Sequence, residues 1–222
     1  MLIDAHIHTS EISYCSRVPR DELIEVAKAD SLDGIVLTNH YKNAYIDIPF
    51  ADWRKKYADE YYLTKEIGAK NGIKVFFGVE ITLDCSKRND FLIMGITPEE
   101  VAAEENLCSL SIPELSDYCR AHNYLLYHAH PYRNTTPVDA QYLYGIEVNC
   151  HPLYKTNEKE RIIAYADKFG LALSCGSDYH GDTYKAHCGV IVPDRISTTE
   201  EYVDYLRSHK RPELLIHDII VK

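Results

Sequence analysis

Short apolar segments alternate along the chain with longer segments of helical period. Unbroken or alternating apolar runs of roughly four to eight residues are typical of strands, and repeats of three and four residues are typical of helices. The pattern predicts six strands, at residues 2–8, 34–40, 74–83, 124–130, 145–149 and 171–177, or seven if residues 90–96 count, and residues 188–192 could add one more. It predicts helices at residues 19–29, 51–69, 98–105, 112–123, 157–169 and 199–209.

The alternation of strands and helices indicates βα units around a mainly parallel sheet. A length of 222 residues suits one hydrophobic core. No internal repeat, low-complexity tract or linker interrupts the pattern. We therefore expect a single α/β domain over residues 1–222.

Histidine and carboxylate side chains recur at or just beyond the predicted strand ends. In a parallel barrel the carboxyl ends of the strands lie on one face, so side chains at these positions converge there. The positions are His6, His8, His40, Glu80, His130, Asp178 and His180. An isolated histidine at a strand end is more often structural than a ligand, so the prediction of a metal site depends on the whole set.

The local spacing supports metal binding. His6 and His8 are separated by one residue, which places both imidazoles on the same side of a strand. Asp178 and His180 repeat this spacing just after another predicted strand. Imidazole and carboxylate ligands favour divalent ions such as Zn, Mn or Fe over thiolate-bound clusters.

The net charge narrows the class of partner. A formal charge of −10 disfavours binding to nucleic-acid phosphates, because that affinity comes mainly from Lys and Arg. Bound metal ions could still attract one phosphate or carboxylate group. We therefore expect a small-molecule substrate, while the sequence does not indicate an oligomeric state.

The cysteines and the absence of long apolar stretches bear on the compartment. Seven cysteines are scattered without a CxxC pair, so no disulfide framework is expected. Cys15, Cys150 and Cys175 are expected to be small buried apolar residues. The first residues lack the basic and apolar pattern of a leader, and no stretch has the length of a membrane span. The expected compartment is the cytoplasm, without membrane attachment.

The metal-type residues fall in five short motifs. These are DAHIHT at residues 4–9, TNH at 38–40, GVE at 78–80, HP at 130–131 and GSDYH at 176–180. In this order and spacing, over nearly the whole chain, they resemble the polymerase and histidinol phosphatase (PHP) family. The resemblance implies a distorted (β/α)7 TIM-like barrel, two or three divalent metal ions and phosphoesterase activity.

The resemblance also implies how the ligands are shared. One ion would be held by His6, His8, Glu80 and Asp178, a second by His130 with Glu80 as a bridge, and a third by His40 with His180. Asp178, His180 and Glu80 are the residues expected to act directly in catalysis.

The chain departs from the family pattern in two places. Where family members often have a Gly-x-His step after the fourth strand, this chain has Gly95, Ile96 and Thr97, which would weaken the second metal site. Where many members carry an Asp or His soon after the second motif histidine, Glu11 or Cys15 could fill the position. Glu11 is the chemically easier substitute for a hard ion.

The expected reaction is an in-line attack on phosphorus by a metal-bound hydroxide, while the ions neutralise the phosphoryl oxygens. Arg133 is placed to clamp a phosphate, with a surface salt bridge as the equally weighted alternative, and Arg17 is a weaker candidate for the same role. Two alternatives remain open. One is a hydrolase that cleaves a C–N or ester bond, and the other is a non-catalytic metal-binding domain.

Overall fold

The computed structural model describes residues 1–86, 88–103, 106–133, 136–152, 158–181 and 186–221. The helices are α1 (Arg20–Ala29), α2 (Phe50–Asn71), α3 (Pro98–Ala103), α4 (Ile112–Ala121), α5 (Lys159–Phe169) and α6 (Thr199–Ser208), with short 3-10 turns at Leu107–Ser109 and Ala140–Tyr142. The strands are β1 (Leu2–Ile7), β2 (Gly34–Leu37), β3 (His40–Tyr41), β4 (Lys74–Thr82), β5 (Asp90–Met94), β6 (Leu125–His128), β7 (Gly145–Asn149), β8 (Ala172–Gly176), β9 (Cys188–Ile191), β10 (Glu213–Ile216) and β11 (Ile219–Val221). The helix boundaries expected at residues 105 and 157 lie outside the described residues.

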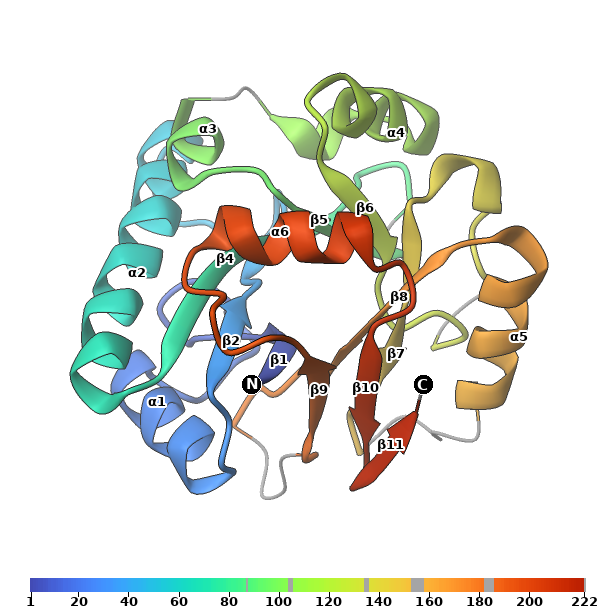
Figure 1. The fold of residues 1–222 in the computed structure, drawn as a ribbon. Coiled ribbons are helices and arrows are strands. Elements are labelled where there is room, and N and C mark those ends of the chain that lie inside the picture. The colour runs from blue at the N-terminus through green and yellow to red at the C-terminus, as the bar shows by residue number, and fades with distance from the viewer. Residues whose placement is uncertain (87, 104–105, 134–135, 153–157, 182–185, 222) are drawn as a thin grey trace.

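The strands form one curled sheet. Within the described residues its order is β11-β10-β9-β1-β2-β4-β5-β6-β7-β8, and β3 pairs with β4 beside this path. The curl brings β8 back beside β1, where Ile7 and Tyr179 form a parallel bridge. The result is a mixed α/β half-barrel, curled but open, with helices around its outside (Figure 1).

The sheet is less parallel than the sequence pattern predicted. β5 is antiparallel to both β4 and β6, and β9, β10 and β11 also pair antiparallel. Only seven residues separate β4 from β5, whereas a parallel connection needs a crossover of about a dozen residues or more. The carboxyl end of β5 therefore lies at the opposite end of the barrel from those of β4 and β6. The sequence reading also missed β10 and β11, which are short.

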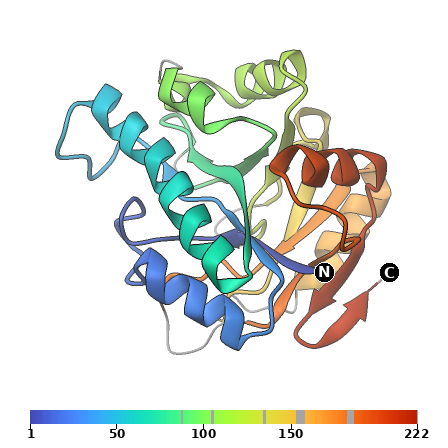
Figure 2. The same cartoon turned by 60° about the vertical axis from the view of Figure 1, so that its left-hand side comes forward.

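Helices α1 and α2 lie side by side over the outer face of β1, β2 and β4 (Figure 2). Leu23 and Ile24 of α1 belong to the same fully buried core as Ile3 and Ile7 of β1. Because side chains alternate along a strand, the even-numbered residues of β1 face the barrel interior. This alternation turns His6 inward.

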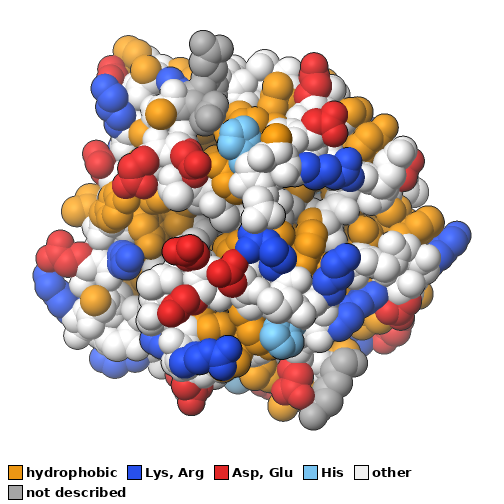
Figure 3. Space-filling model, turned by 45° about the horizontal axis from the view of Figure 1, so that its top comes forward, with side chains coloured by type: hydrophobic (Ala, Val, Ile, Leu, Met, Phe, Trp, Pro, Cys, Tyr) orange, Lys and Arg blue, Asp and Glu red, His pale blue; other side chains and the backbone are white. Residues whose placement is uncertain are grey.

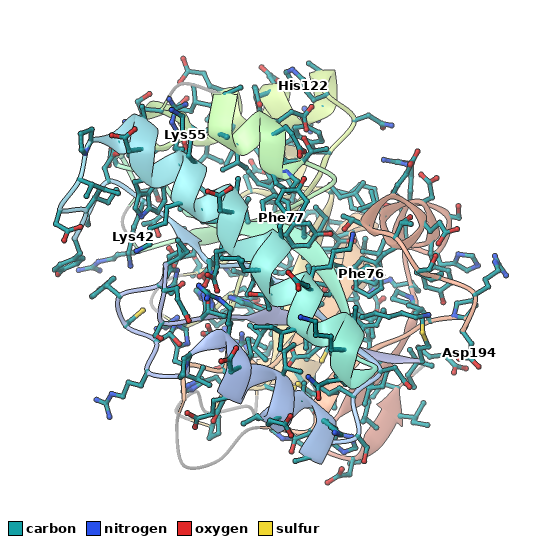
Figure 4. The ribbon with its side chains drawn as sticks, turned by 90° about the vertical axis from the view of Figure 1, so that its left-hand side faces the viewer. Lys42, Lys55, Phe76, Phe77, His122 and Asp194 are labelled. Carbon is teal, nitrogen blue, oxygen red and sulfur yellow. The ribbon has the colours of Figure 1, made fainter. Side chains whose placement is uncertain are left out.

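The barrel interior changes from apolar to ionisable along β4. Helix α6 lies across the opening in Figure 1, and its Tyr202 stacks on Phe76 with ring centroids 5.2 Å apart. The neighbouring Phe77 packs instead against Tyr61 of α2, and Figure 4 shows Phe77 beside this helix. Phe76 and Glu80 both lie in β4, and because side chains alternate along a strand, the two residues are on the same face. The apolar contact between Phe76 and Tyr202 is thus at one end of the barrel interior, and the ionisable groups around Glu80 are at the other.

None of the helices in the described ranges is both long enough and apolar enough to cross a membrane.

Candidate metal centre

Four buried side chains, located in or just beyond three strands, meet at the open end of the barrel. Nε2 of His6 lies 3.0 Å from Nε2 of His8. Oδ1 of Asp178 lies 3.4 Å from the first of these nitrogens and 3.1 Å from the second. Oε1 of Glu80 is 3.5 Å from His6 Nε2, and all four side chains are inaccessible to solvent. Four donor atoms converging in this way form a site suited to one metal ion.

Glu80 also belongs to a second group of donors. Its Oε1 is 2.8 Å from Nε2 of His130, and Asp90 Oδ2 is 3.7 Å from the same nitrogen. Sequence reasoning missed Asp90, because the prediction considered only the carboxyl ends of strands. Asp90 is the first residue of β5, and the antiparallel direction of β5 brings this residue to the metal end of the barrel.

A third group of donors is built from histidines. The Nε2 atoms of His40 and His180 lie 3.3 Å apart, and the ring of His8 stacks on that of His180 at 4.2 Å between centroids. His40 also touches Glu80 through its Nδ1 atom. The structure therefore brings together all seven residues singled out in the sequence, with Glu80 and His8 each shared between two groups.

The donor atoms of this centre are better suited to coordinating metal ions than to forming hydrogen bonds with one another. Oε2 of Glu80, Oδ1 of Asp178 and Nδ1 of His40 are buried and lie close to one another or to His8, but none of them meets the geometry of a hydrogen bond with a described residue. Buried polar atoms of this kind are costly unless a partner or a cation compensates them. The donors are imidazole nitrogens and carboxylate oxygens, which suits Zn, Mn or Fe.

The backbone at two ligands has an unusual conformation. His130 has a φ of 30° and Asp178 a φ of 54°, both in the left-handed region that most residues avoid. Both lie just beyond strand ends, and the N–H of Asp178 donates to the carbonyl of His6 at 2.8 Å. Strained backbone of this kind is found mainly at functional sites, where the surrounding structure holds it in place.

Glu147 on β7 orients two of the ligands. Its Oε1 is 2.8 Å from Nδ1 of His6, and its Oε2 accepts the backbone N–H of His130 at 2.7 Å. The carboxylate fixes which nitrogen of His6 carries the proton, leaving Nε2 for the metal. No role was assigned to Glu147 from the sequence. The signal that could have found it is its position on the inner face of β7.

The carboxylates set the protonation of the metal-free histidines. Burial alone would lower the pKa of His40, but Glu80 raises it to about 10. Burial would likewise lower the pKa of His6, and Glu147 and Glu80 instead raise it well above its usual value. His8 differs, because burial and the neighbouring His180 and His40 together hold its pKa well below the usual value. His8 is therefore neutral and ready to bind metal.

A cleft of about 540 Å³ opens beside these groups and is bordered by His40, Asp90, Lys42 and Arg133. Nη1 of Arg133 lies 3.2 Å from His130 Nε2 and 3.5 Å from Asp178 Oδ2, so its guanidinium lies over the donors. Figure 4 shows Lys42 at this end of the molecule, with Asp194 at the opposite end.

Arg17 is placed differently from Arg133. Its backbone N–H donates to the carbonyl of His180 at 2.8 Å, but its side chain is exposed. The structure thus keeps Arg17 beside the centre through its backbone, while Arg133 reaches the donors with its guanidinium.

Glu11 and Cys15, the two residues considered for the position soon after His8, have different surroundings in the structure. Glu11 accepts the backbone N–H of Arg20 at 3.3 Å. Cys15 borders the cleft, and although partial burial would raise the pKa of its thiol, hydrogen bonds with His180 and His40 lower it to about 6. The expectation that Cys15 is buried was wrong, because it is exposed, whereas Cys150 and Cys175 are fully buried.

Thr97 does not lie at the metal centre. It precedes α3, where its N–H and hydroxyl both donate to Glu100 Oε2, at 2.7 and 2.8 Å. It borders a second cleft, of about 520 Å³, at the other end of β5. Figure 3 shows this end of the molecule, around α3, α4 and α6, where acidic, basic and apolar side chains are interspersed. From the sequence, Thr97 was expected to stand at the second metal site. Because β5 runs antiparallel to its neighbours, the residues that follow it lie at the end of the barrel away from the metal centre.

No family model matches the sequence, and no curated protein matches it. Solved structures do. A two-domain protein of Bacteroides vulgatus containing a predicted PHP-like metal-dependent phosphoesterase matches with a TM-score of 0.68 and 17% identity, over 100% of this chain and 66% of that one. An amidohydrolase of Chromobacterium violaceum with bound sulfate matches with a TM-score of 0.60 and 14% identity, over 92% and 96% of the two chains. A proposed metal-dependent phosphoesterase of Bifidobacterium adolescentis matches with a TM-score of 0.51 and 16% identity, over 92% of this chain and 95% of that one.

At these identities the similarity establishes the fold. The open half-barrel is the distorted barrel of PHP-like metal-dependent phosphoesterases, which confirms the fold class implied by the sequence motifs. The chain spans just under two thirds of the length of the Bacteroides protein. Within this fold the buried His, Glu and Asp clusters are candidate metal sites.

Proposed function

We propose that this chain is a metal-dependent phosphoesterase, acting as one PHP-type domain, that hydrolyses a small phosphorylated metabolite or nucleotide. The observation that carries the proposal is the sharing of Glu80 and His8 among three donor groups, with Arg133 over them. Shared ligands can hold two or three divalent ions side by side, an arrangement that two-metal phosphatases use to stabilise the attacking and leaving oxygens.

When bound, such ions supply an activated water and neutralise the phosphoryl oxygens. The protein side chains have separate tasks. Glu80 and Asp178 would hold the ions from the barrel interior, where both side chains are buried. Arg133 can donate two parallel hydrogen bonds to phosphoryl oxygens, which orients the ester. His180, which is partly exposed, can move a proton at the mouth of the cleft.

The surroundings of the cleft favour a phosphate ester over a neutral amide. Lys42 and Arg133 are both on its border, and their charges complement a phosphoryl group. The net charge of −10 disfavours a long nucleic-acid substrate. A volume of about 540 Å³ is within the range of small-molecule sites.

The test combines metal analysis with a substrate panel. Protein purified without chelator is analysed for metals, and hydrolysis of an aryl phosphate, several sugar phosphates and nucleotides is measured with added Zn, Mn or Fe. Metal-dependent phosphate release that is lost in His6→Ala and Asp178→Ala supports the proposal. Turnover of amides or carboxylic esters alone would support the C–N or ester hydrolase instead. Bound metal without any turnover would support a non-catalytic metal-binding domain.

A further inference from the structure

A second group of metal-type side chains lies apart from the histidine centre and consists of cysteines. Cys150 directly follows β7, Cys175 lies in β8, and Cys188 begins β9. All three side chains are inaccessible to solvent. Sγ of Cys150 is 3.7 Å from Sγ of Cys175, and the three sulfurs lie within 4.8 Å of one another.

This cysteine cluster is on the other side of β8 from the histidines. A Cβ added to Gly176 would lie 2.3 Å from the Cβ of His6, so Gly176 faces the histidine centre. Side chains alternate along a strand, and Cys175 therefore faces away from that centre. Its Sγ lies 3.4 Å from the carbonyl oxygen of Leu215 on β10. The cluster is thus located between β8 and the C-terminal strands.

The sulfur separation fits a bound ion. In a tetrahedral zinc site with Zn–S bonds of about 2.3 Å, two sulfurs lie roughly 3.8 Å apart. The observed 3.7 Å between Cys150 and Cys175 is close to this value and far from the roughly 2.05 Å of a disulfide. Soft thiolates select zinc over the hard ions, and a closed set of four protein ligands is typical of structural rather than catalytic zinc.

His217 is the candidate for the fourth ligand, and it lies outside the group of three sulfurs that are within 4.8 Å of one another. His217 lies in the two-residue turn between β10 and β11, and its Nε2 is buried with no hydrogen-bond partner among the described residues. His217 directly follows Ile216, which pairs with Cys188 across β9 and β10, so the turn that carries His217 lies next to the cysteine cluster. His187 also has a buried Nε2 without a hydrogen-bond partner among the described residues, but its Nδ1 is engaged by Asp218 at 2.7 Å.

We propose that Cys150, Cys175, Cys188 and His217 bind a structural zinc ion. The ion displaces the thiol protons of the three cysteines and joins β7 and β8 to β9 and the β10–β11 hairpin. Strands β10 and β11 are short and lie at one edge of the sheet, so a cross-link of this kind fastens them to the barrel. The ligands come from separate strands, which is why they form no CxxC motif in the sequence.

The first experiment uses cobalt in place of zinc. Thiolate bound to Co²⁺ gives a charge-transfer band in the near ultraviolet, which imidazole and carboxylate ligands do not give. The full chain carrying Cys15→Ser is used, because Cys15 is the thiol beside the histidine centre. We expect the band to be present, to persist when His6→Ala and Asp178→Ala are added, and to disappear with Cys175→Ala.

Matched variants serve as controls. Cys108→Ala removes a buried cysteine outside the cluster and should leave the band and the zinc content unchanged. Cys175→Ala should lower the zinc content by about one ion per chain, as expected for a single closed site. His217→Ala should change the band and His187→Ala should not.

A measurement without substitutions in the cluster keeps the proposal testable if Cys175→Ala fails to fold. X-ray absorption of the zinc-loaded Cys15→Ser chain should show a shell of sulfur atoms at about 2.3 Å. A zinc environment without sulfur, or no thiolate band with cobalt, would overturn the proposal. So would recovery of a disulfide among the three cysteines in place of three metal-protected thiols.

Discussion

The carboxylate of Asp4 holds Ser177 at two points. Oδ1 accepts the backbone N–H of Ser177 at 2.9 Å, and Oδ2 accepts its hydroxyl at 2.6 Å. Asp4 lies two residues before His6, and Ser177 directly precedes Asp178. The pair therefore fixes β1 against the segment after β8 at the point where each provides a metal ligand.

Ser177→Ala should weaken metal binding while leaving every ligand in place. A buried hydrogen bond to a charged group contributes about 1.5–3 kcal/mol, so the free energy of unfolding should fall by about this amount. Loss of a group that supports the ligands typically lowers metal affinity about 10- to 100-fold. Chemical denaturation measures the first effect, and competition with a chelator measures the second.

Ser174→Ala provides the matched control on the same strand. Ser174 is fully buried, and its Oγ has no hydrogen-bond partner among the described residues. Its replacement should leave metal affinity unchanged and stability equal or slightly higher, because an unsatisfied buried hydroxyl is removed. Equal losses in Ser174→Ala and Ser177→Ala would refute a specific role for the contact with Asp4.

Glu147→Gln tests the orientation of His6. The substitution keeps the shape of the side chain but removes the charge that faces His6 Nδ1 at 2.8 Å. We expect metal affinity to fall about 10- to 100-fold, with little change in the far-ultraviolet circular dichroism spectrum. The expected cause is a poorer hydrogen bond from Nδ1, which lowers the basicity of Nε2. Unchanged affinity would show that packing alone orients the ring.

The regular spacing of the chain made much of the fold and of the site predictable. His6 and His8 alternate on a strand that could be recognised from its apolar neighbours, and parallel strand geometry then placed them with Asp178. The direction of β5 was not predictable in the same way. A short loop decides it, and the apolar pattern of a buried strand is the same in both directions. The direction of β5 places Asp90 at the metal end of the barrel and Thr97 at the opposite end.

Contacts between strands that are distant in sequence also could not be predicted from the spacing of residues. Cys150 directly follows β7, Cys175 lies in β8 and Cys188 begins β9, and nothing in their spacing indicates that their sulfurs meet. Glu147 is similar, because a carboxylate on a buried strand shows its partner only once β7 is placed opposite β1. Tertiary structure, rather than local propensity, determines these contacts.

Arg133→Ala should weaken substrate binding more than Arg17→Ala does. The guanidinium of Arg133 lies 3.5 Å from Asp178 Oδ2, whereas Arg17 contacts the centre through its backbone N–H, which donates to the carbonyl of His180. Loss of a charge-assisted clamp on a phosphoryl group should raise KM about tenfold for a phosphate ester and weaken competitive inhibition by inorganic phosphate by a similar factor. Arg133→Lys should restore only part of the loss, because Lys cannot donate two parallel hydrogen bonds. Steady-state kinetics with all three variants measures these effects. Equal effects of Arg133→Ala and Arg17→Ala would favour a surface salt bridge for Arg133.

Metal binding should release protons. Glu80 raises the pKa of His40 to about 10 against the effect of burial, so this ring is protonated at pH 8 in the metal-free chain. A histidine must lose its proton to bind a metal, and metal affinity should therefore rise as the pH increases from 8 toward 10. Calorimetric titration in two buffers of different ionisation enthalpy measures the number of protons released.

A comparison of two ligand variants assigns the protons. His40→Gln should lower the number of protons released by about one, because the protonated ring is gone. His8→Gln removes a ring that is already neutral, since its pKa lies well below the usual value, and should leave the number nearly unchanged. Both variants lose one ligand, so their difference reports protonation rather than coordination. Identical proton release in the two variants would contradict the assignment of the charge to His40.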